Sequence, residues 1–394
     1  MRIRLKSHGE SLRILVARTD RIGDVLLSTP VVAALKKQFP NSRLTFMVQE
    51  LVAPLLKNVE GIDDLFIYDP NGRHKGFGGF FRLMEELKAQ HFQIAILLNP
   101  TLKVSAAAYG VGIPNRLGPL SKPHSFLFLN RGVRQRRSLV EMHEADYNLQ
   151  LLRKLGIRTT THTIATRVKI DDTKKQYARE WLSSRGWNKN VDSHARLIVV
   201  HPGMGGSALN WPENHYVDLV RAIKREGHAV LITGGPQEGE LLERIRIELE
   251  KTNENALFYH AQGKIDELAA LFDEASVVVA PSTGPLHIAV ALGKPTVSFY
   301  PPIRVQSAIR WGPYLPDADK ASVLVPEVYC GQDFKCLGPE CTYYPCMKSI
   351  GPRLAMEELN KQLSNVVSQE VLKIENTEKD KVTHEQDTSV DKTV

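Results

Sequence analysis

The stretch that decides the fold is Val278–Pro295, which reads VVAPSTGPLHIAVALGKP. A short apolar run predicts a buried strand, and a small polar turn is followed at once by a helical segment. A helix that begins at Gly284 leaves the N–H groups of its first turn unpaired, and its dipole places partial positive charge there. Such a helix end is suited to a phosphate. Ser282, Thr283 and His287 would add polar contacts, although an ordinary strand-to-helix turn capped by a hydroxyl explains the same residues.

The same alternation of strands and helices extends over most of the chain. Nearly continuous apolar runs predict strands, because helices cover both faces of a parallel sheet in such proteins. In the first half we expect strands at 12–18, 43–48, 65–68 and 93–98 and helices at 23–38, 80–89 and 143–155. In the second half we expect strands at 196–200, 229–233, 256–259, 276–280 and 296–300 and helices at 212–226, 238–251, 265–273 and 285–292.

This pattern predicts an α/β protein with two doubly wound, Rossmann-like domains that face a central cleft. We place an N-terminal domain at 1–170, a C-terminal domain at 171–370 and a disordered charged tail at 371–394. Ligands of such sheets bind beyond the carboxyl ends of the strands, so the informative loops should lie there.

Composition narrows the class of partner. The chain has 394 residues and a net charge of +7, which suits an anionic partner. No apolar run approaches the ~20 residues of a transmembrane helix, and no apolar core follows the basic N-terminus as in a secretory signal. We therefore expect a cytoplasmic protein. The densest basic cluster, Arg131–Arg137, is either a solvated loop or a site for acceptor phosphates or anionic lipid head groups. Aromatic and basic residues do not interleave as in single-strand nucleic-acid binders, so we expect no nucleic acid.

All four cysteines lie in one window, at Cys330, Cys336, Cys341 and Cys346. Clustered cysteines in a cytosolic protein favour a metal over disulfides. Their spacing lacks the C-x-x-C pairs of common zinc sites. A structural metal site, free thiols and a redox-dependent link therefore all stay open.

The loop after the first strand leads to an acidic residue that is a candidate helix cap or general base. Asp24 directly follows Gly23 at the start of a predicted helix. A carboxylate there is a common helix cap or dipole partner, and it is also placed to act as a general base at a cleft. Asp20 is the competing base. The residues by themselves favour the cap.

Two glycine-rich loops follow strands of the second half. Residues 201–212 read HPGMGGSALNWP, and residues 233–240 read TGGPQEGE. Glycines let the backbone approach a ligand closely. Glu238 or Glu240 could accept hydrogen bonds from ribose hydroxyls, and helix N-terminal acidity explains both residues equally.

Taken together, these motifs resemble glycosyltransferase family 9, the ADP-heptose:lipopolysaccharide heptosyltransferases and their relatives. The resemblance rests on Arg-x-Gly-Asp near the N-terminus, the His-Pro-Gly loop that runs into Trp-Pro, the Gly-Gly-Pro loop and the segment Ser282–Ala289. The sequence His143-Glu144-x-x-x-Asn148-Leu149 is similar as well. The resemblance covers nearly all of residues 12–350. It implies the GT-B fold, with the acceptor on the N-terminal domain and the nucleotide-sugar on the C-terminal domain. It also implies an inverting reaction that needs no bound metal or cofactor.

The resemblance implies roles for individual residues. Asp24 matches the catalytic base, and Glu238 looks like the ribose contact. We expect the nucleotide-sugar at Gly203, Gly205, Gly206, Ser207, Glu238, Ser282, Thr283, Gly284, Pro285 and His287. We expect the acceptor at Arg18, Arg21, Gly23, Arg134 and Arg137.

Two positions depart from the family's pattern. Many members have a lysine that pairs with the diphosphate where this chain has Leu209, and many have an aspartate where it has Ser282. Losing one cation and one carboxylate roughly preserves the local charge. Arg304 or Lys294 is a candidate for the missing cation.

The sequence therefore predicts an inverting glycosyltransferase that moves heptose from ADP-heptose to a lipopolysaccharide core or related lipid-linked glycan. The enzyme would work at the cytoplasmic face of the inner membrane, with peripheral contact only. Two alternatives stay open at this point. One is a sugar-nucleotide epimerase of similar architecture, and the other is a degenerate nucleotide- or glycan-binding assembly factor.

Overall fold

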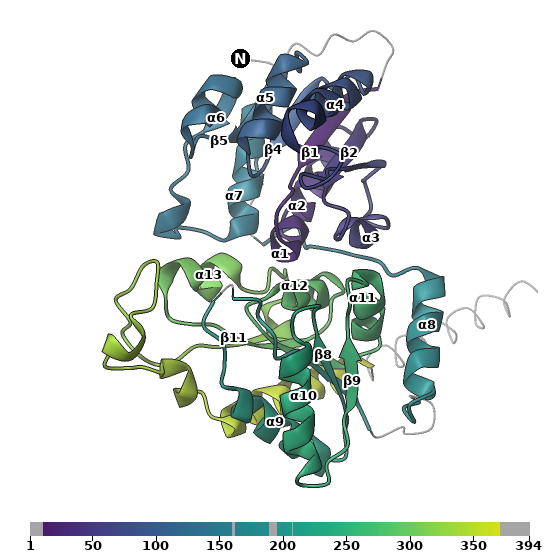
Figure 1. The fold of residues 1–394 in the computed structure, drawn as a ribbon, viewed down its shortest axis with the longest axis vertical. Helices are drawn as coiled ribbons and strands as arrows, with labels where there is room; N and C mark the ends of the chain where they lie inside the picture. The colour runs from purple at the N-terminus through teal and green to yellow at the C-terminus, as the bar shows by residue number, and fades with distance from the viewer. Residues whose placement is uncertain (1–10, 160–161, 189–194, 207, 371–394) are drawn as a thin grey trace, which may run out of the picture.

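The computed structural model describes residues 11–159, 162–188, 195–206 and 208–370. Its strands form two sheets of six, and every strand pairing is parallel. The predicted α/β class with two doubly wound sheets is confirmed, and Figure 1 shows the two layered units one above the other. The predicted tail at 371–394 lies outside the described residues.

The first sheet has the order β3-β2-β1-β4-β5-β6. Its strands are β1 (Arg13–Ala17), β2 (Arg43–Val48), β3 (Asp64–Ile67), β4 (Ile94–Leu97), β5 (Asn115–Pro119) and β6 (Arg131–Val133). Its helices are α1 (Ile22–Leu26), α2 (Thr29–Gln38), α3 (Ala53–Leu56), α4 (Gly76–Ala89), α5 (Leu102–Gly110), α6 (Pro123–Phe128) and α7 (Glu144–Gln150).

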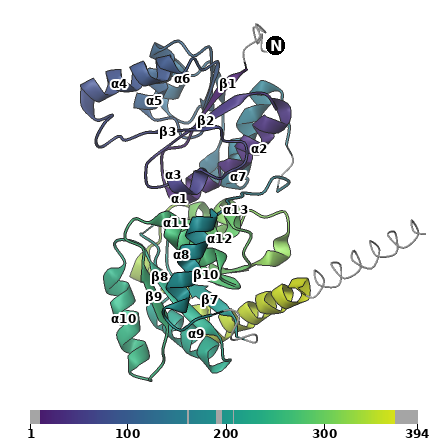
Figure 2. The same ribbon diagram turned by 90° about the vertical axis from the view of Figure 1, so that its right-hand side faces the viewer.

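The second sheet repeats this topology with the order β12-β11-β10-β7-β8-β9. Its strands are β7 (Leu197–Val200), β8 (Ala229–Gly234), β9 (Leu257–His260), β10 (Val277–Pro281), β11 (Thr296–Phe299) and β12 (Ala321–Leu324). The helices around it are α8 (Asp172–Ser183), α9 (Glu213–Arg225), α10 (Gly239–Glu250), α11 (Ile265–Asp273), α12 (Gly284–Ala291) and α13 (Ala308–Trp311). Residues 352–370 are also helical and pack into its core (Figure 2).

The predicted helix at 23–38 is two helices, and proline explains the break. Pro30 has no N–H to continue the hydrogen-bond ladder of α1, and its ring disfavours the preceding turn. The hydroxyl of Thr29 donates to the Leu26 carbonyl at 2.8 Å, and the Ser28 hydroxyl donates to the Asp24 carbonyl at 2.7 Å. The interruption limits α1 to five residues and leaves Asp24 in its first turn.

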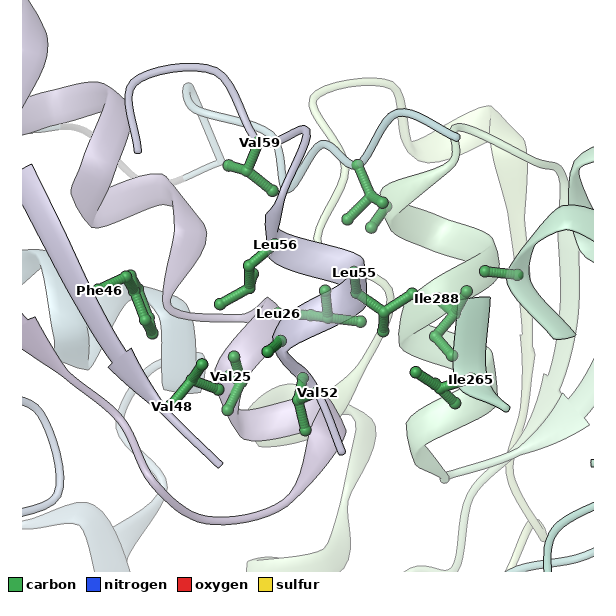
Figure 3. Close-up of a cluster of buried hydrophobic side chains, with 14 of the residues drawn as sticks. Val25, Leu26, Phe46, Val48, Val52, Leu55, Leu56, Val59, Ile265 and Ile288 are labelled. Atoms are coloured by element: carbon green, nitrogen blue, oxygen red, sulfur yellow. The ribbon is translucent and has the colours of Figure 1, made fainter. Parts of the chain in front are cut away.

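One apolar core joins the two units. It contains residues of α1 and α3 from the first half and of α11 and α12 from the second. Figure 3 shows Leu26 and Leu55 lying beside Ile265 and Ile288 across this junction, and these four side chains are almost fully buried. Because burial of apolar surface is the main favourable term in folding, the contact fixes how the strand ends of one sheet face those of the other.

The basic cluster Arg131–Arg137, expected as a loop or an anion site, begins as a strand. Residues 131–133 form β6 and pair with β5 at the sheet edge. Its first three residues are half-buried, and Arg134 and Arg136 are exposed.

Candidate functional site

A cleft of about 490 Å³ lies where the two units meet. Its lining comes from the segments that follow β1 in the first sheet and β7, β10 and β11 in the second. The predicted residues in this lining are Arg21, Gly23, Asp24, Gly205, Ser282, Thr283, Gly284, Pro285 and His287. The structure therefore brings the two motifs that are farthest apart in the sequence, near residues 24 and 284, to one site.

Two glycines let the helices of this site approach closely. A Cβ atom on Gly23 would lie 2.6 Å from Cδ2 of His287, and one on Gly284 would lie 3.1 Å from Cβ of Ile22. His287 is buried and cannot easily give way. Gly23 is thus required by the packing of α1 against α12, which the sequence had placed only as a candidate acceptor contact.

Asp24 belongs to a buried ionic cluster around Arg18. The Arg18 guanidinium contacts Asp24, lies 2.7 Å from Oδ1 of Asp20 and lies 3.2 Å from Oε1 of Glu144. Arg18 is 3% exposed. Its three carboxylate partners occupy it, so its position suits orienting Asp24 better than contacting an acceptor.

The Asp24 carboxyl has an unusual proton affinity. Burial raises its pKa to about 6, although the neighbouring Arg18 favours the ionised form. A carboxylate with a pKa near the operating pH is well matched to general base chemistry. Asp20, the competing base, is held by Arg18 and accepts a hydrogen bond from Asn99 at 2.9 Å.

Glu144 connects the two halves of the cleft. Its carboxylate is 1% exposed and contacts Arg18 and Arg137 of the first half. Its second oxygen lies 3.2 Å from the guanidinium of Arg310, which comes from α13 of the second half and lines the cleft. Burial opposes ionisation of Glu144, but the three arginines hold its pKa below the ordinary value. Arg310 was missed by sequence reasoning, because no motif marks it and 166 residues separate it from Glu144.

The neighbours of Glu144 hold the same junction. His143 Nε2 lies 2.9 Å from the Gly312 carbonyl oxygen, and the Tyr314 hydroxyl donates to Asp146 at 2.6 Å. The rings of His143 and Tyr314 are stacked. The His-Glu motif therefore attaches the segment that carries Arg310 to the first half of the protein.

The other wall of the cleft is the start of α12. The Ser282 and Thr283 side chains lie before its first turn, and His287 follows within it. Burial lowers the pKa of His287 to about 3, so its ring is neutral. Its Nδ1 atom is buried without a hydrogen-bond partner among the described residues. This wall carries the hydroxyls of Ser282 and Thr283 and the first N–H groups of α12, but no acidic side chain.

The glycine loop after β7 reaches the cleft only in part. Gly205 and Gly206 have φ values of +58° and +71°, which glycine adopts at little cost. Gly205 lines the cleft, whereas Gly203 and Gly206 do not, and Ser207 lies outside the described residues. Glu238 lies behind this loop: it accepts a hydrogen bond from the Gly235 N–H at 2.6 Å, and a Cβ atom on Gly203 would collide with its carboxylate.

The position of the missing lysine is covered by a different segment. The N–H of Leu209 donates to the Gln306 side chain at 3.3 Å, and Gln306 lines the cleft with Arg310. Neither cation suggested by the sequence lies in the lining. Arg304 pairs with Asp333 at 3.0 Å, and Lys294 lies 3.6 Å from Asp273.

The remaining predicted acceptor residues are separated. Arg137 is held by Glu144 inside the ionic cluster, and Arg134 is exposed with its guanidinium over the ring of Phe126. Arg21 is exposed at the cleft and precedes α1.

The four cysteines gather away from the cleft. Cys330, Cys336, Cys341 and Cys346 are free thiols that line one small pocket. Burial raises the pKa of Cys346, and the other three thiols add to the effect. No group of three or more His, Cys, Asp or Glu side chains arranged to hold a metal is found over the described ranges. Within those ranges no helix is long and apolar enough to cross a membrane.

The chain is similar in sequence to known and putative glycosyltransferases. The sequence profile of glycosyltransferase family 9 (heptosyltransferase) matches residues 80–342. A Haemophilus influenzae protein named "Putative glycosyltransferase" is 31% identical over 80% of this chain and 89% of its own length. Lipooligosaccharide heptosyltransferase 2 of the same organism is 25% identical over 90% of this chain and all of its own length.

Solved structures agree on the fold. A family 9 glycosyltransferase from Veillonella parvula superposes with a TM-score of 0.78 at 23% identity, over 90% of this chain and 98% of its own. The E. coli ADP-heptose lipopolysaccharide heptosyltransferase II superposes with a TM-score of 0.71 at 21% identity, over 90% and 99%. The predicted resemblance is thereby confirmed: the chain has the GT-B fold and belongs to glycosyltransferase family 9.

Proposed function

We propose that the protein is an inverting heptosyltransferase that moves heptose from ADP-heptose to a lipopolysaccharide core or a related lipid-linked glycan. The observation that carries the proposal is the cleft itself. It sets the Asp24 carboxylate, whose pKa lies near 6, opposite the start of α12. One wall can accept a proton and the other can bind an anion. That pairing is what transfer of a sugar from a nucleoside diphosphate requires.

In this proposal Asp24 is the general base. Its carboxylate takes the proton of the acceptor hydroxyl as the hydroxyl oxygen attacks the anomeric carbon of the sugar. The new C–O bond forms on the face opposite the departing ADP, whose bond to the anomeric carbon breaks, so the configuration inverts. Arg18 fixes the orientation of Asp24, and Glu144 holds Arg18. We assign the acceptor's charged groups to the exposed Arg21, which borders the cleft beside Asp24.

The donor diphosphate would lie against the start of α12. Its negative charge grows as the sugar leaves, and preorganised donors stabilise such charge. We assign this role to the hydroxyls of Ser282 and Thr283, the first N–H groups of α12 and the guanidinium of Arg310. Arg310 then supplies the cation that many family members take from a lysine at the position of Leu209. We assign the nucleoside end to the Gly203–Ser207 loop and to Glu238 behind it.

The test is a transfer assay with purified protein, ADP-heptose and heptose-deficient lipopolysaccharide. We expect ADP release that depends on the acceptor, and a product whose anomeric configuration, read by NMR, is opposite to that of the donor. Conversion of the donor without an acceptor would favour the epimerase instead. ADP binding with no turnover of this donor and acceptor would refute the proposed sugar transfer. Absence of both binding and turnover would favour the assembly factor.

A further inference from the structure

Five large apolar side chains are exposed on three neighbouring helices of the first half. Helix α5 packs between α4 and α6, and Figure 1 shows the three helices in a row on one side of the sheet. We call this surface the α4–α6 face. Phe77 is 79% exposed and Leu127 is 69% exposed. An apolar surface of this kind marks an interaction site in a soluble domain. Its apolar residues are Phe77, Phe81, Leu102, Phe126 and Leu127.

The same part of the chain carries the positive charge of the protein. Residues 73–137 contain eleven lysines and arginines and two glutamates, a net charge of +9. The whole chain has a net charge of +7, so the remainder carries −2. Lys75 and Lys122 immediately precede α4 and α6. Arg82, which follows Phe81 in the chain, is exposed, and the exposed Arg134 lies over the Phe126 ring. Exposed apolar side chains among basic ones are complementary to an anionic lipid surface.

Hydrogen bonds connect this face to the candidate base. Lys103 at the start of α5 donates to the Gly76 carbonyl at the start of α4 at 3.2 Å. His124 in α6 lies 3.0 Å from the Pro100 carbonyl, just before α5. The adjacent Asn99 donates to Asp20 at 2.9 Å, and Asp20 shares Arg18 with Asp24. The starts of the three helices therefore lie together, and Asn99 is linked through Asp20 and Arg18 to Asp24.

We propose that the α4–α6 face docks on an anionic bilayer, with its phenylalanine and leucine side chains inserted among the lipids and its basic side chains at the head groups. This inference rests on the proposed function, because it brings the Asp24 wall to the membrane that holds a lipid-linked acceptor. A second exposed aromatic region offers a contrast. Tyr329 and Phe334 are exposed in the cysteine segment, but residues 326–348 contain two lysines and three acidic residues, which gives no attraction for an anionic surface.

The test is sedimentation of the full chain with vesicles of phosphatidylcholine alone or mixed with phosphatidylglycerol. We expect binding only to the anionic vesicles, and binding that weakens as salt is added. The double variant Phe77→Ser/Leu127→Ser should bind about tenfold or more weakly, because two inserted side chains are lost. The matched control Tyr329→Ser/Phe334→Ser should bind like the wild type. Equal binding of both double variants, or no binding of the wild type to anionic vesicles, would overturn the proposal.

A transfer assay separates this proposal from the proposed function. The Phe77→Ser/Leu127→Ser variant should lose transfer to an acceptor embedded in anionic vesicles and keep transfer to a deacylated, water-soluble acceptor. If the wild type transfers to neither acceptor, the proposed function fails while the vesicle result still decides the docking surface. A concentration-dependent dimer that the double variant abolishes, without vesicle binding by the wild type, would assign the face to a second copy of the chain.

Discussion

The two walls of the cleft come from sheets of the same topology, yet their chemistry is opposite. The wall after β1 is densely charged: Asp24, Asp20 and Glu144 share Arg18. The wall after β10 presents the hydroxyls of Ser282 and Thr283 and the neutral ring of His287. The comparison teaches that a repeated fold can divide a reaction between its copies. In the proposed function one copy handles the proton, and the other, without acidic side chains, binds the anion.

Arg310 is the exception that joins the two walls. It belongs to the second half but pairs with Glu144 of the first. Its guanidinium lines the cleft and is held there by a carboxylate of the opposite wall. If Arg310 is the cation of the donor site, as we propose, that site depends on the contact between the domains.

The largest effect should follow from removing the charge of the first wall. We expect Asp24→Asn to lower the rate of transfer by about 10²–10⁴-fold, the range that a positioned general base contributes. ADP release in the presence of acceptor measures it. Asp172→Asn is the matched control, because its side chain is fully exposed, and it should keep full activity. A variant at Asp24 that retains most of the activity would remove the base from our mechanism.

A smaller loss should follow from removing the cation of the second wall. We expect Arg310→Met to weaken kcat/KM for the donor by roughly 30-fold, since a charge-assisted hydrogen bond contributes about 2 kcal/mol. Glu144 keeps Arg18 and Arg137 in this variant, so the fold should persist. Arg353→Met, at an exposed surface pair with Glu357, serves as the control. If donor titrations of Arg310→Met show unchanged kinetics, Arg310 is not the cation that binds the diphosphate.

The contact between the two walls can be tested by measuring the thermal stability of a glycine variant. Gly23→Ala would place a Cβ atom 2.6 Å from the buried His287 ring, and overpacking of this kind costs about 1–3 kcal/mol. We expect thermal unfolding to shift to lower temperature and the transfer rate to fall as α1 moves relative to α12. Gly351→Ala, where no atom lies within 4 Å of the new Cβ, should leave the melting temperature nearly unchanged. Equal melting curves for the two variants would show that the helices tolerate a wider spacing.

The smallest expected effect that distinguishes the two walls is in the pH dependence of the reaction. Burial raises the pKa of Asp24 to about 6, and the base must be ionised, so kcat/KM should rise with pH up to about 6 and then level off. His287, with a pKa of about 3, stays neutral across this range and adds no second limb. The profile of Asp24→Asn should lose the rise. A wild-type rate that is constant between pH 5 and 7 would contradict the proposed base.

Much of the fold could be predicted because its central strands are continuously apolar. The predicted segments 43–48 and 296–300 coincide with β2 and β11 almost to the residue. The missed strands include β5 and its edge neighbour β6 in the first sheet, and there is a physical reason. β5 reads NRLGP and β6 reads RGV, and strands that are only partly covered do not need an apolar run. Pro30 marks the break between α1 and α2 in the sequence. The break was not predicted, because the amphipathic pattern continues across this proline.

The candidate site could be predicted only as far as its loops. Strand-end motifs marked Asp24 and the segment 282–287, because glycines and hydroxyls between a strand and a helix are a local signal. The burial of Arg18 and the contact between Glu144 and Arg310 depend on how the two domains pack, and no local pattern reports that. The same applies to Gly23, whose need for a small residue arises from His287 far away in the chain.

Our central claim is that the first wall takes the proton and the second wall binds the nucleotide. It is tested most directly by calorimetric titration of ADP into the wild type, Asp24→Asn and Arg310→Met. Our account predicts that Asp24→Asn binds ADP like the wild type, although it no longer transfers sugar, and that Arg310→Met binds ADP roughly 30-fold more weakly. Loss of ADP affinity in Asp24→Asn with full affinity in Arg310→Met would contradict the account, because the charged wall would then be the one that binds the nucleotide.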